Sequence, residues 1–301
     1  MEQKLMTESE KLLAMAPQGW NATPDYQDDE LMIIDTVKIL GHPDSIKPNM
    51  NIVAFCTQGR LTVMLNDEPL EVTANQIFIC PPETRVSNLM VSADFEFVAL
   101  CITNHAMQHF IRQHISVWNQ VLYVKKSRVF SISDHDATFC GMAYELLRMC
   151  MREQTEPDDE VYQRDIINGL LSTLLIGLCH LLKRQLDITQ EKPQQNVSFF
   201  NRFLNLLQKT EHKHRPVEYY ASQLFISPKY LTIICKKNSD KTANDWIREY
   251  TLADISYYLR NTELSVKEIS IKLGFPNTSF FGKYVKEHFG CTPLAYRSKQ
   301  Q

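Results

Sequence analysis

The chain has 301 residues, 44% of them hydrophobic and 22% charged, which is an ordinary soluble globular composition with room for two domains. Its net charge of −3 hides an asymmetry, because residues 198–301 carry 16 Lys and Arg against 9 Asp and Glu, whereas residues 1–197 carry 16 against 26. A basic C-terminal third on an acidic body is typical of a nucleic-acid-binding module attached to a regulatory domain.

The sequence predicts neither a secreted nor a membrane protein. The N-terminus has no apolar core after its first charges, so no signal peptide is visible and we expect a cytoplasmic protein. The longest apolar run, Gly169 to Leu182, is interrupted by polar residues and is too short to span a bilayer. The eight cysteines form no Cys-x-x-Cys pair, so we expect free thiols in a reducing compartment.

Residues 31–103 have the texture of an all-β domain. Runs of β-branched and aromatic residues, such as 52–55 and 61–65, alternate with turn signals that include the dipeptide Asn66-Asp67. Many short strands with regular turns predict a small barrel or jelly roll. A small organic effector is the default ligand for a concave apolar pocket. The residues that we predict to line this effector pocket are Trp20, Tyr26, Val53, Phe55, Val63, Ile77 and Ile79.

Helical periodicity replaces the strands after about residue 104, and we predict helices over 105–114, 134–151 and 161–185. The third helix is apolar around much of its circumference, so it must be buried in its own domain or against a second copy. We therefore expect a homodimer formed through this helix. The polar stretch 187–197 is the predicted linker between a regulatory and dimerisation domain, 1–186, and a helical domain, 198–301.

The helical domain contains an internal repeat at an offset of 49 to 50 residues. Residues 220–231 and 269–281 each describe a short amphipathic helix, a tight turn and a second helix, which is the helix-turn-helix pattern. A predicted helix over 244–260, about 25 Å long, joins the two units. It places the two second helices roughly one DNA turn, about 34 Å, apart.

The helix boundaries carry matching capping signals. Ser265 and Glu268 have the spacing of a capping box at the start of the second unit. Ser227 is followed by a proline at the first helical position, which is a favoured N-terminal arrangement. Gly274 falls where a helix end favours a residue that tolerates positive φ. Two such patterns in tandem are a strong signal for DNA binding.

Residues 219–296 resemble the DNA-binding domain of the AraC family of regulators. The shared motifs are Tyr220-Ala221, Ile226 to Leu231, Trp246-Ile247, Leu264 to Ile269, Leu273 to Asn277, Ser279 to Phe281, Gly290 to Pro293 and Tyr296-Arg297. The resemblance implies that the second helix of each unit reads bases. The implied base-reading positions are Lys229, Thr232, Ile233, Thr278, Ser279, Gly282 and Lys283. The expected phosphate contacts are Ser227, Tyr230, Lys236, Lys237, Asn277 and Lys286.

Two positions depart from the family pattern, and a third is an unusual residue for a helix interior. The family usually has a long basic residue at the position of Ile233, and an apolar side chain contacts a thymine methyl but cannot hydrogen-bond guanine. An aromatic residue is usual at the position of Cys235. Gly282 costs about 1 kcal/mol in a helix relative to Ala, and we interpret it as allowing a close approach to the DNA backbone.

With this C-terminus, the β-rich front resembles the cupin-like sensor barrels of the same family. We therefore expect an α+β protein of two domains that regulates transcription on double-stranded DNA together with RNA polymerase. Regulation by a protein partner, or by oligomerisation alone, is the alternative to a small effector.

A metal-dependent cupin enzyme is a poor alternative. Such a site needs two or three imidazoles and a carboxylate, whereas His42 is the only histidine from 31 to 103. We expect no catalytic residue, no cofactor and no metal. Core packing is the favoured role of Cys56 and Cys80, and His105 with His109 is expected on a solvated helix face. A solvent-exposed loop is the favoured interpretation of residues 211–215.

Overall fold

The computed structural model of the chain describes residues 20–22, 26–27, 31–34, 37–39, 45, 47–124, 126–152, 159–188 and 195–298. The chain divides into two bodies. The sheet body comprises residues 1–114 and 127–188, and the helical body comprises residues 115–126 and 189–301. The predicted boundaries differ from this division in one respect, because the short segment 115–126 packs with the C-terminal residues.

The first elements of the sheet body in its described residues are strands. In chain order they are β1 (Trp20–Ala22), β2 (Tyr26–Gln27), β3 (Leu31–Ile34), β4 (Val37–Ile39), β5 (Asn51–Gln58), β6 (Arg60–Leu65), β7 (Glu68–Thr73), β8 (Gln76–Cys80), β9 (Val86–Val91), β10 (Glu96–Ile102) and β11 (Val129–Ser131). Of these described strands, six form one antiparallel sheet in the order β11-β8-β5-β10-β3-β2, and three form a second sheet in the order β7-β6-β9.

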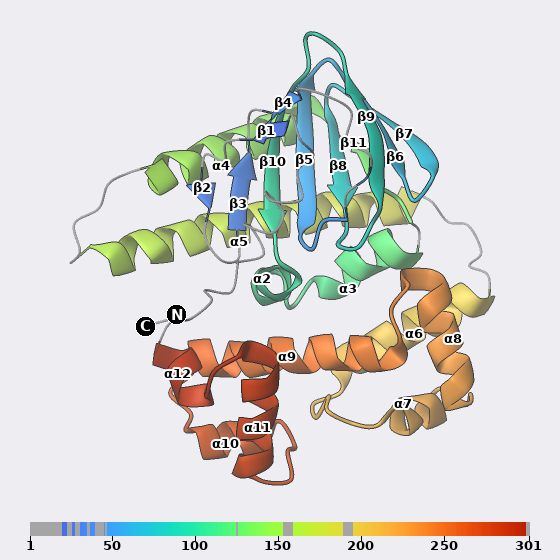
Figure 1. The fold of residues 1–301 in the computed structure, drawn as a ribbon, viewed down its shortest axis with the longest axis vertical. Helices are drawn as coiled ribbons and strands as arrows, with labels where there is room; N and C mark the ends of the chain where they lie inside the picture. The colour runs from blue at the N-terminus through green and yellow to red at the C-terminus, as the bar shows by residue number, and fades with distance from the viewer. Residues whose placement is uncertain are drawn as a thin grey trace. The chain divides into compact units, whose positions relative to one another are not determined.

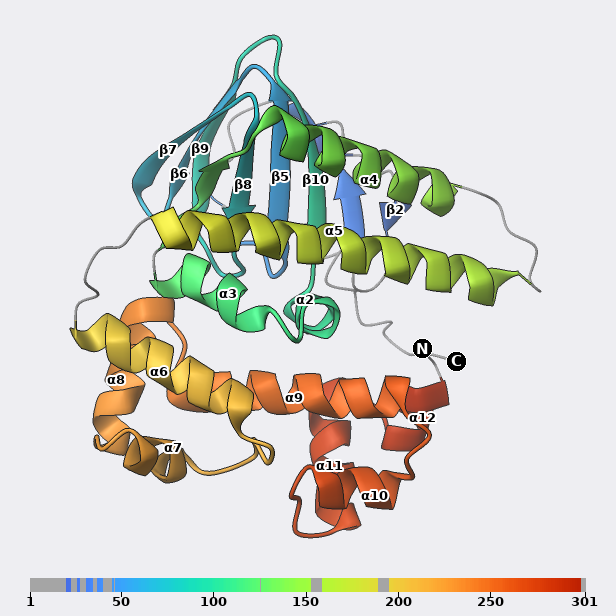
Figure 2. The same cartoon turned by 180° about the vertical axis from the view of Figure 1, so that it is seen from behind.

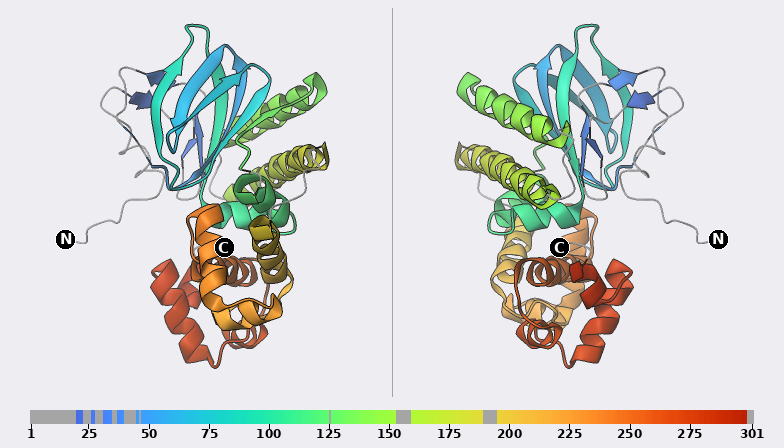
Figure 3. Two further views of the ribbon diagram at one scale, coloured as in Figure 1. Left: turned by 90° about the vertical axis from the view of Figure 1, so that its right-hand side faces the viewer. Right: turned by 90° about the vertical axis from the view of Figure 1, so that its left-hand side faces the viewer.

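The predicted barrel is therefore an open sandwich, since the two sheets do not close on each other (Figure 3). The chain changes sheets between β5 and β6 at Gly59, which has φ +74°. A side chain at Gly59 would lie 2.7 Å from the Cα atom of Phe95, so the tight passage requires glycine. The predicted Asn66-Asp67 hairpin is present between β6 and β7, with both residues at positive φ.

Helices of the sheet body cover one face of the larger sheet. These are α4 (Asp134–Arg152) and α5 (Glu160–Ile188), which run across the strands in Figure 2, while α2 (Asn104–Phe110) follows β10 and lies beyond the ends of the strands, next to α5. The opposite face of the large sheet packs on the small sheet around a core that includes Ala54, Cys56, Phe78 and Cys80. Burial raises the pKa of the Cys80 thiol to about 12, which favours the uncharged thiol.

Helix α5 shows that the apolar segment is longer than the run Gly169 to Leu182 that the sequence analysis considered too short to span a bilayer. Its segment Val161–Gln185 is long and apolar enough to cross a membrane by length and composition. In this structure 28% of the apolar window in that segment is buried, and Leu171 and Leu175 of α5 are among the residues that pack inside the sheet body. The predicted linker is also partly helical, because α5 continues to Ile188 and the next helix begins at Gln195.

The helical body contains two short elements from the middle of the chain and all of the C-terminal helices. They are α3 (Ile115–Asn119), the π-helical turn η1 (Gln120–Val124), α6 (Gln195–Lys209), α7 (Val217–Gln223), α8 (Pro228–Ser239), α9 (Ala243–Asn261), α10 (Val266–Lys272), α11 (Thr278–Phe289) and α12 (Pro293–Ser298). Helix α9 lies between the pairs α7–α8 and α10–α11 in Figure 1. Its 19 residues span about 28 Å at the usual rise.

Candidate nucleic-acid interface

The second helices of the two repeats, α8 and α11, each bury one face and expose another. Leu231, Ile234 and Cys235 of α8 are buried, as are Phe281 and Val285 of α11. The positions that the sequence predicted to read bases are exposed or half-buried, namely Lys229, Thr232, Ile233, Thr278, Ser279, Gly282 and Lys283. The predicted phosphate-contacting residues Ser227, Tyr230, Lys236, Lys237, Asn277 and Lys286 are exposed. The structure thus places all of these residues on accessible surfaces of α8, α11 and their N-caps.

The start of each exposed helix is fixed by a side-chain cap. The Ser227 hydroxyl accepts a hydrogen bond from the Tyr230 backbone N–H at 3.2 Å, and the Asn277 side-chain oxygen accepts one from the Phe280 N–H at 2.8 Å. The hydroxyl proton of Ser227 and the amide protons of Asn277 are donors that these bonds do not use. Both caps can therefore hold the helix and donate to an anionic oxygen at the same time.

Of the two first helices, α10 begins with a side-chain cap, whereas α7 begins after Pro216 without one. The predicted capping box is present at α10, where the Ser265 hydroxyl accepts from the Glu268 N–H at 3.2 Å and the Glu268 carboxylate accepts from the Ser265 N–H at 2.7 Å. These hydrogen bonds lower the pKa of Glu268. The turn after α10 has Gly274 at φ +74°, and the turn after α7 has Phe225 at φ +57° in the corresponding place. The apolar residue that follows this position is buried more deeply in the second turn, because Phe275 is 6% exposed whereas the corresponding Ile226 is half-buried.

Two of the predicted base-reading positions now have a defined environment. Ile233 is 52% exposed, which is incompatible with an inward position beneath Trp246. A Cβ atom on Gly282 would meet nothing within 4 Å, so packing within the protein does not require glycine at this position. Both residues lie on the exposed side of their helices and are accessible to a ligand.

The segment 115–126, which is remote in sequence, completes the core of the first repeat. Trp118 and Leu122 in it are 2% and 0% exposed. The Tyr123 ring meets the Trp246 ring edge-on with centroids 5.2 Å apart, and the Asn119 side-chain amide donates a hydrogen bond of 2.9 Å to the Tyr250 hydroxyl. Sequence reasoning placed no element in this segment, although its apolar residues recur at helical spacing.

The predicted effector-pocket residues do not share one cavity. Val53, Phe55 and Ile77 line a cavity of about 50 Å³ between the large sheet and helices α4 and α5. Val63 belongs instead to the core between the two sheets. Ile79 is fully buried, and strand alternation places it on the same side of β8 as Ile77. The apolar cavity thus lies between the large sheet and helices α4 and α5. Trp20 and Tyr26 fall in β1 and β2, but their side chains lie outside the described residues.

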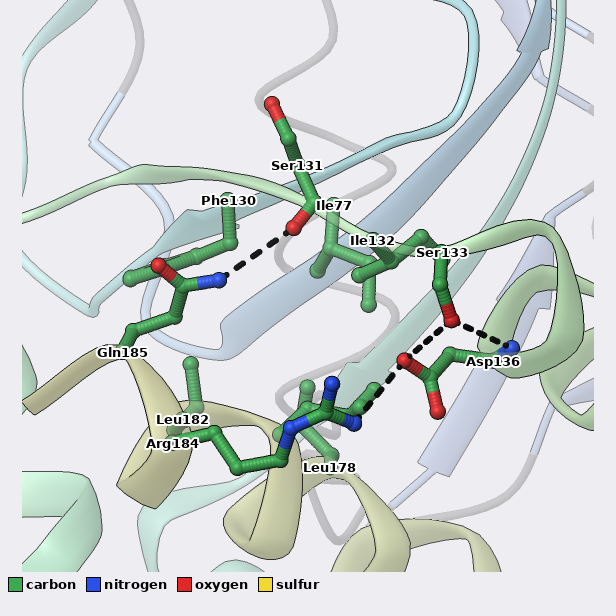
Figure 4. A pocket seen from close by; sticks show the side chains of 11 residues that line it. Ile77, Phe130, Ser131, Ile132, Ser133, Asp136, Leu178, Leu182, Arg184 and Gln185 are labelled. Carbon is green, nitrogen blue, oxygen red and sulfur yellow. Dashed lines mark hydrogen bonds and ion pairs between the residues drawn. The ribbon is translucent and has the colours of Figure 1, made fainter. Parts of the chain in front are cut away.

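A second, smaller cavity of about 40 Å³ lies where α4 begins (Figure 4). The Ser133 hydroxyl donates to the Asp136 carboxylate at 2.7 Å, and Arg184 of α5 donates to the same carboxylate at 3.1 Å. These interactions lower the pKa of Asp136, with the Ser133 hydrogen bond as the largest cause. Since these polar groups bond to one another, they fasten α4 to α5, and the apolar cavity is the better candidate for a ligand.

The same helices expose an apolar stripe that the sequence reading missed. Phe139, Met142, Leu146 and Met149 of α4 recur at spacings of 3, 4 and 3 residues and are between 41% and 68% exposed. On α5, Tyr162 and Ile166 are exposed, whereas Leu171 and Leu175 are buried. The spacing of the stripe was visible in the sequence, but its exposure depends on which face of α4 packs on the sheet. We call these four α4 residues the α4 stripe.

Comparisons with known proteins agree with the C-terminal architecture. Residues 220–299 match a family model described as a helix-turn-helix domain. The regulatory protein PocR of Salmonella typhimurium is 26% identical over 152 residues, which are 46% of this chain and 50% of that protein. The Msm operon regulatory protein of Streptococcus mutans is 20% identical over 256 residues, 83% of this chain and 84% of that protein. The transcriptional activator RhaR of an Enterobacter species is 20% identical over 149 residues, covering 49% and 53%.

The match spans about half the length of PocR and RhaR. PocR and the Msm operon protein are named as regulatory proteins, and RhaR is named as a helix-turn-helix-type transcriptional activator. Among solved structures, the C-terminal domain of the response regulator yesN from Fusobacterium nucleatum is 25% identical and covers 32% of this chain and 94% of that one, with a TM-score of 0.30. A TM-score of this size supports no inference about the fold.

Proposed function

We propose that this chain, whose residues 220–299 are a helix-turn-helix domain of the AraC type, is a regulator of transcription that binds double-stranded DNA through α8 and α11. The observation that carries the proposal is the pair of capped helices, each buried on its apolar face and exposed along its polar and basic face. With about 28 Å of α9 between the two repeats, one chain can address two successive major grooves.

In this proposal the two sets of predicted residues have different tasks. Lys229, Thr232 and Ile233 of α8 read bases, as do Thr278, Ser279, Gly282 and Lys283 of α11. The lysines at positions 236, 237 and 286, the caps Ser227 and Asn277, and Tyr230 bind phosphates. Phosphate contacts supply affinity without sequence preference, whereas contacts with base edges supply specificity.

Salt dependence tests the proposal. Six to eight phosphate contacts predict that the logarithm of the association constant falls with the logarithm of salt concentration with a slope of about −5 to −7. Lys286→Ala weakens binding to all sequences alike and flattens that slope by about one unit. Lys183→Ala removes an exposed lysine of α5 and is the matched control, which leaves the slope unchanged. A wild-type slope near zero would contradict the proposed interface.

We further propose that a small apolar molecule regulates the protein from the cavity between the large sheet and helices α4 and α5. This location replaces the barrel interior expected from the sequence. The cavity of about 50 Å³ holds only a few water-sized groups, so a larger ligand must move α4 or α5 away from the sheet. The α4 stripe lies on the same helix, and a homodimer formed through it would respond to that movement. RNA polymerase, in the cytoplasm, is the proposed partner of the DNA-bound dimer.

A melting-temperature screen against small apolar metabolites tests the effector site. A ligand at 100 times its dissociation constant stabilises the folded protein by about 2.7 kcal/mol. Val53→Leu adds volume inside the cavity and should abolish the shift, because Val53 lines it. A shift of the same size in this variant would place the ligand elsewhere. If no metabolite stabilises the wild type, regulation by a protein partner or by oligomerisation is favoured instead.

A further inference from the structure

The two helix-turn-helix repeats are connected by more than helix α9. The loop between α6 and α7 belongs to the first repeat, yet it contacts the turn and the exposed helix of the second. The His214 ring stacks on the Phe275 ring with centroids 4.8 Å apart and an interplanar angle of 8°. The same ring meets Tyr284 of α11 edge-on, also at 4.8 Å. His214 thus joins the first repeat to both parts of the second.

His212 makes a second contact from the same loop. A Cβ atom added to Gly274 would lie 2.8 Å from Cγ and 2.9 Å from Cβ of His212. The glycine therefore serves two purposes, because it adopts φ +74° and it leaves room for the histidine. Neighbouring residues of the turn, Gly274 and Phe275, are each covered by one histidine of the loop.

The loop is fixed on its own side as well. Lys213, between the two histidines, forms a buried ion pair of 2.7 Å with Asp254 of α9. Its backbone carbonyl accepts a hydrogen bond of 2.7 Å from the Tyr220 hydroxyl of α7. The loop is consequently fixed relative to α7 and α9. A contact between a loop side chain and the second repeat therefore fixes the second repeat relative to the first.

If helix α9 were the only connection, the two helix-turn-helix repeats could rotate relative to each other about its axis whenever the helix bends or unwinds slightly. A second contact between the two repeats opposes this twist, and the His214 and His212 contacts join the loop of the first repeat to the turn of the second. The loss of water from one side of the ring lowers the pKa of His214, and the proximity of His288 lowers it further, which favours the uncharged ring although the residue remains partly accessible to solvent. A neutral ring stacks without the cost of desolvating a charge.

We propose that His214 is a positioning residue that fixes the rotational phase of α8 relative to α11, and thereby the spacing between half-sites that the protein accepts. This inference rests on the proposed function. One base pair inserted between the half-sites displaces them by about 3.4 Å and rotates one relative to the other by about 34°. If the two repeats are held rigidly, the protein binds such a duplex much more weakly. If they rotate freely, the affinity falls little.

The experiment compares two duplexes, a site obtained by randomised-site selection with the wild-type chain and the same site with one base pair inserted between its half-sites. Fluorescence anisotropy gives the ratio of the two dissociation constants for each full-length variant. An aromatic contact of this kind is worth about two- to tenfold in an equilibrium constant. His214→Ala should reduce the wild-type ratio by about that factor, while the affinity for an isolated half-site is unchanged.

Three further variants make the result decisive. His214→Phe keeps a stacking ring and should retain the wild-type ratio, which a merely destabilising role would not predict. His135→Ala removes an exposed histidine of α4 and is the matched control. If circular dichroism shows that His214→Ala is unfolded, His214→Gln keeps the length of the side chain without the ring and takes its place.

The outcomes separate this inference from the function on which it rests. A wild type that discriminates between the duplexes, together with a His214→Ala variant that discriminates equally well, overturns the positioning role and leaves the proposed function intact. A wild type that binds no selected duplex overturns both. A reduced ratio in His214→Ala that His214→Phe restores supports the positioning role.

Discussion

The hydrogen bond between Asn119 and Tyr250 offers a direct test of how the helical body is assembled. The two residues are 131 positions apart, and the Asn119 amide lies 2.9 Å from the buried Tyr250 hydroxyl. Asn119→Ala leaves that hydroxyl buried without its donor, and Tyr250→Phe leaves the amide without its acceptor. Each change should lower the free energy of unfolding by about 1–3 kcal/mol. The double variant should lose less than the sum, since the two single changes remove the same bond.

Urea unfolding followed by tryptophan fluorescence measures this effect in the helical body. Trp118 and Trp246 both lie in that body, and Trp20→Phe removes the third tryptophan of the chain. With a slope of about 2 kcal/mol per molar urea, each single variant should unfold at a midpoint lower by about 0.5–1.5 M. The assignment of residues 115–126 to the helical body would be refuted by either of two results. The losses of unfolding free energy in the two single variants could add up to that of the double variant, or the single variants could have unchanged urea midpoints.

Three variants test other parts of the proposal. Ile233→Arg should shift the base preference of the first repeat from thymine towards guanine by about 1–3 kcal/mol in a randomised-site selection, and an unchanged selection would mean that residue 233 reads no base. Gly282→Ala should stabilise α11 by about 1 kcal/mol yet weaken DNA binding, and undiminished affinity would contradict a close approach to the DNA backbone. Met142→Glu with Met149→Glu should give folded monomers in sedimentation, because the side chains are 65% and 68% exposed, and a dimeric double variant would place the interface elsewhere.

The dimerisation variants illustrate where sequence periodicity is insufficient. The apolar pattern of residues 161–185 made Leu171 and Leu175 the natural choice for an interface, but they are 2% and 1% exposed inside the sheet body. Glutamate at either position would bury a charge and unfold the domain instead of separating protomers. Periodicity defines the faces of a helix, and only the packing partner decides which face is covered.

The same limit of sequence periodicity explains why the effector pocket was expected inside the barrel. Alternation along β5 and β8 correctly separates Val53, Phe55 and Ile77 from their neighbours Ala54, Cys56 and Phe78. Both sets are apolar because both faces of the large sheet are covered, one by the small sheet and one by α4 and α5. With no polar face to orient the strands, the sequence could not indicate which set points into the sandwich.

Local chemistry by itself determined the helix-turn-helix repeats. Short-range hydrogen bonds within four residues form the caps at Ser227 and Ser265, so their signals are readable in the sequence and the structure contains both. The predicted joining helix, 244–260, differs from α9 by one residue at each end. Contacts between remote residues were decided only by the tertiary structure. His214 meets Phe275 across 61 positions and Asn119 meets Tyr250 across 131, and no local pattern encodes a partner at that distance.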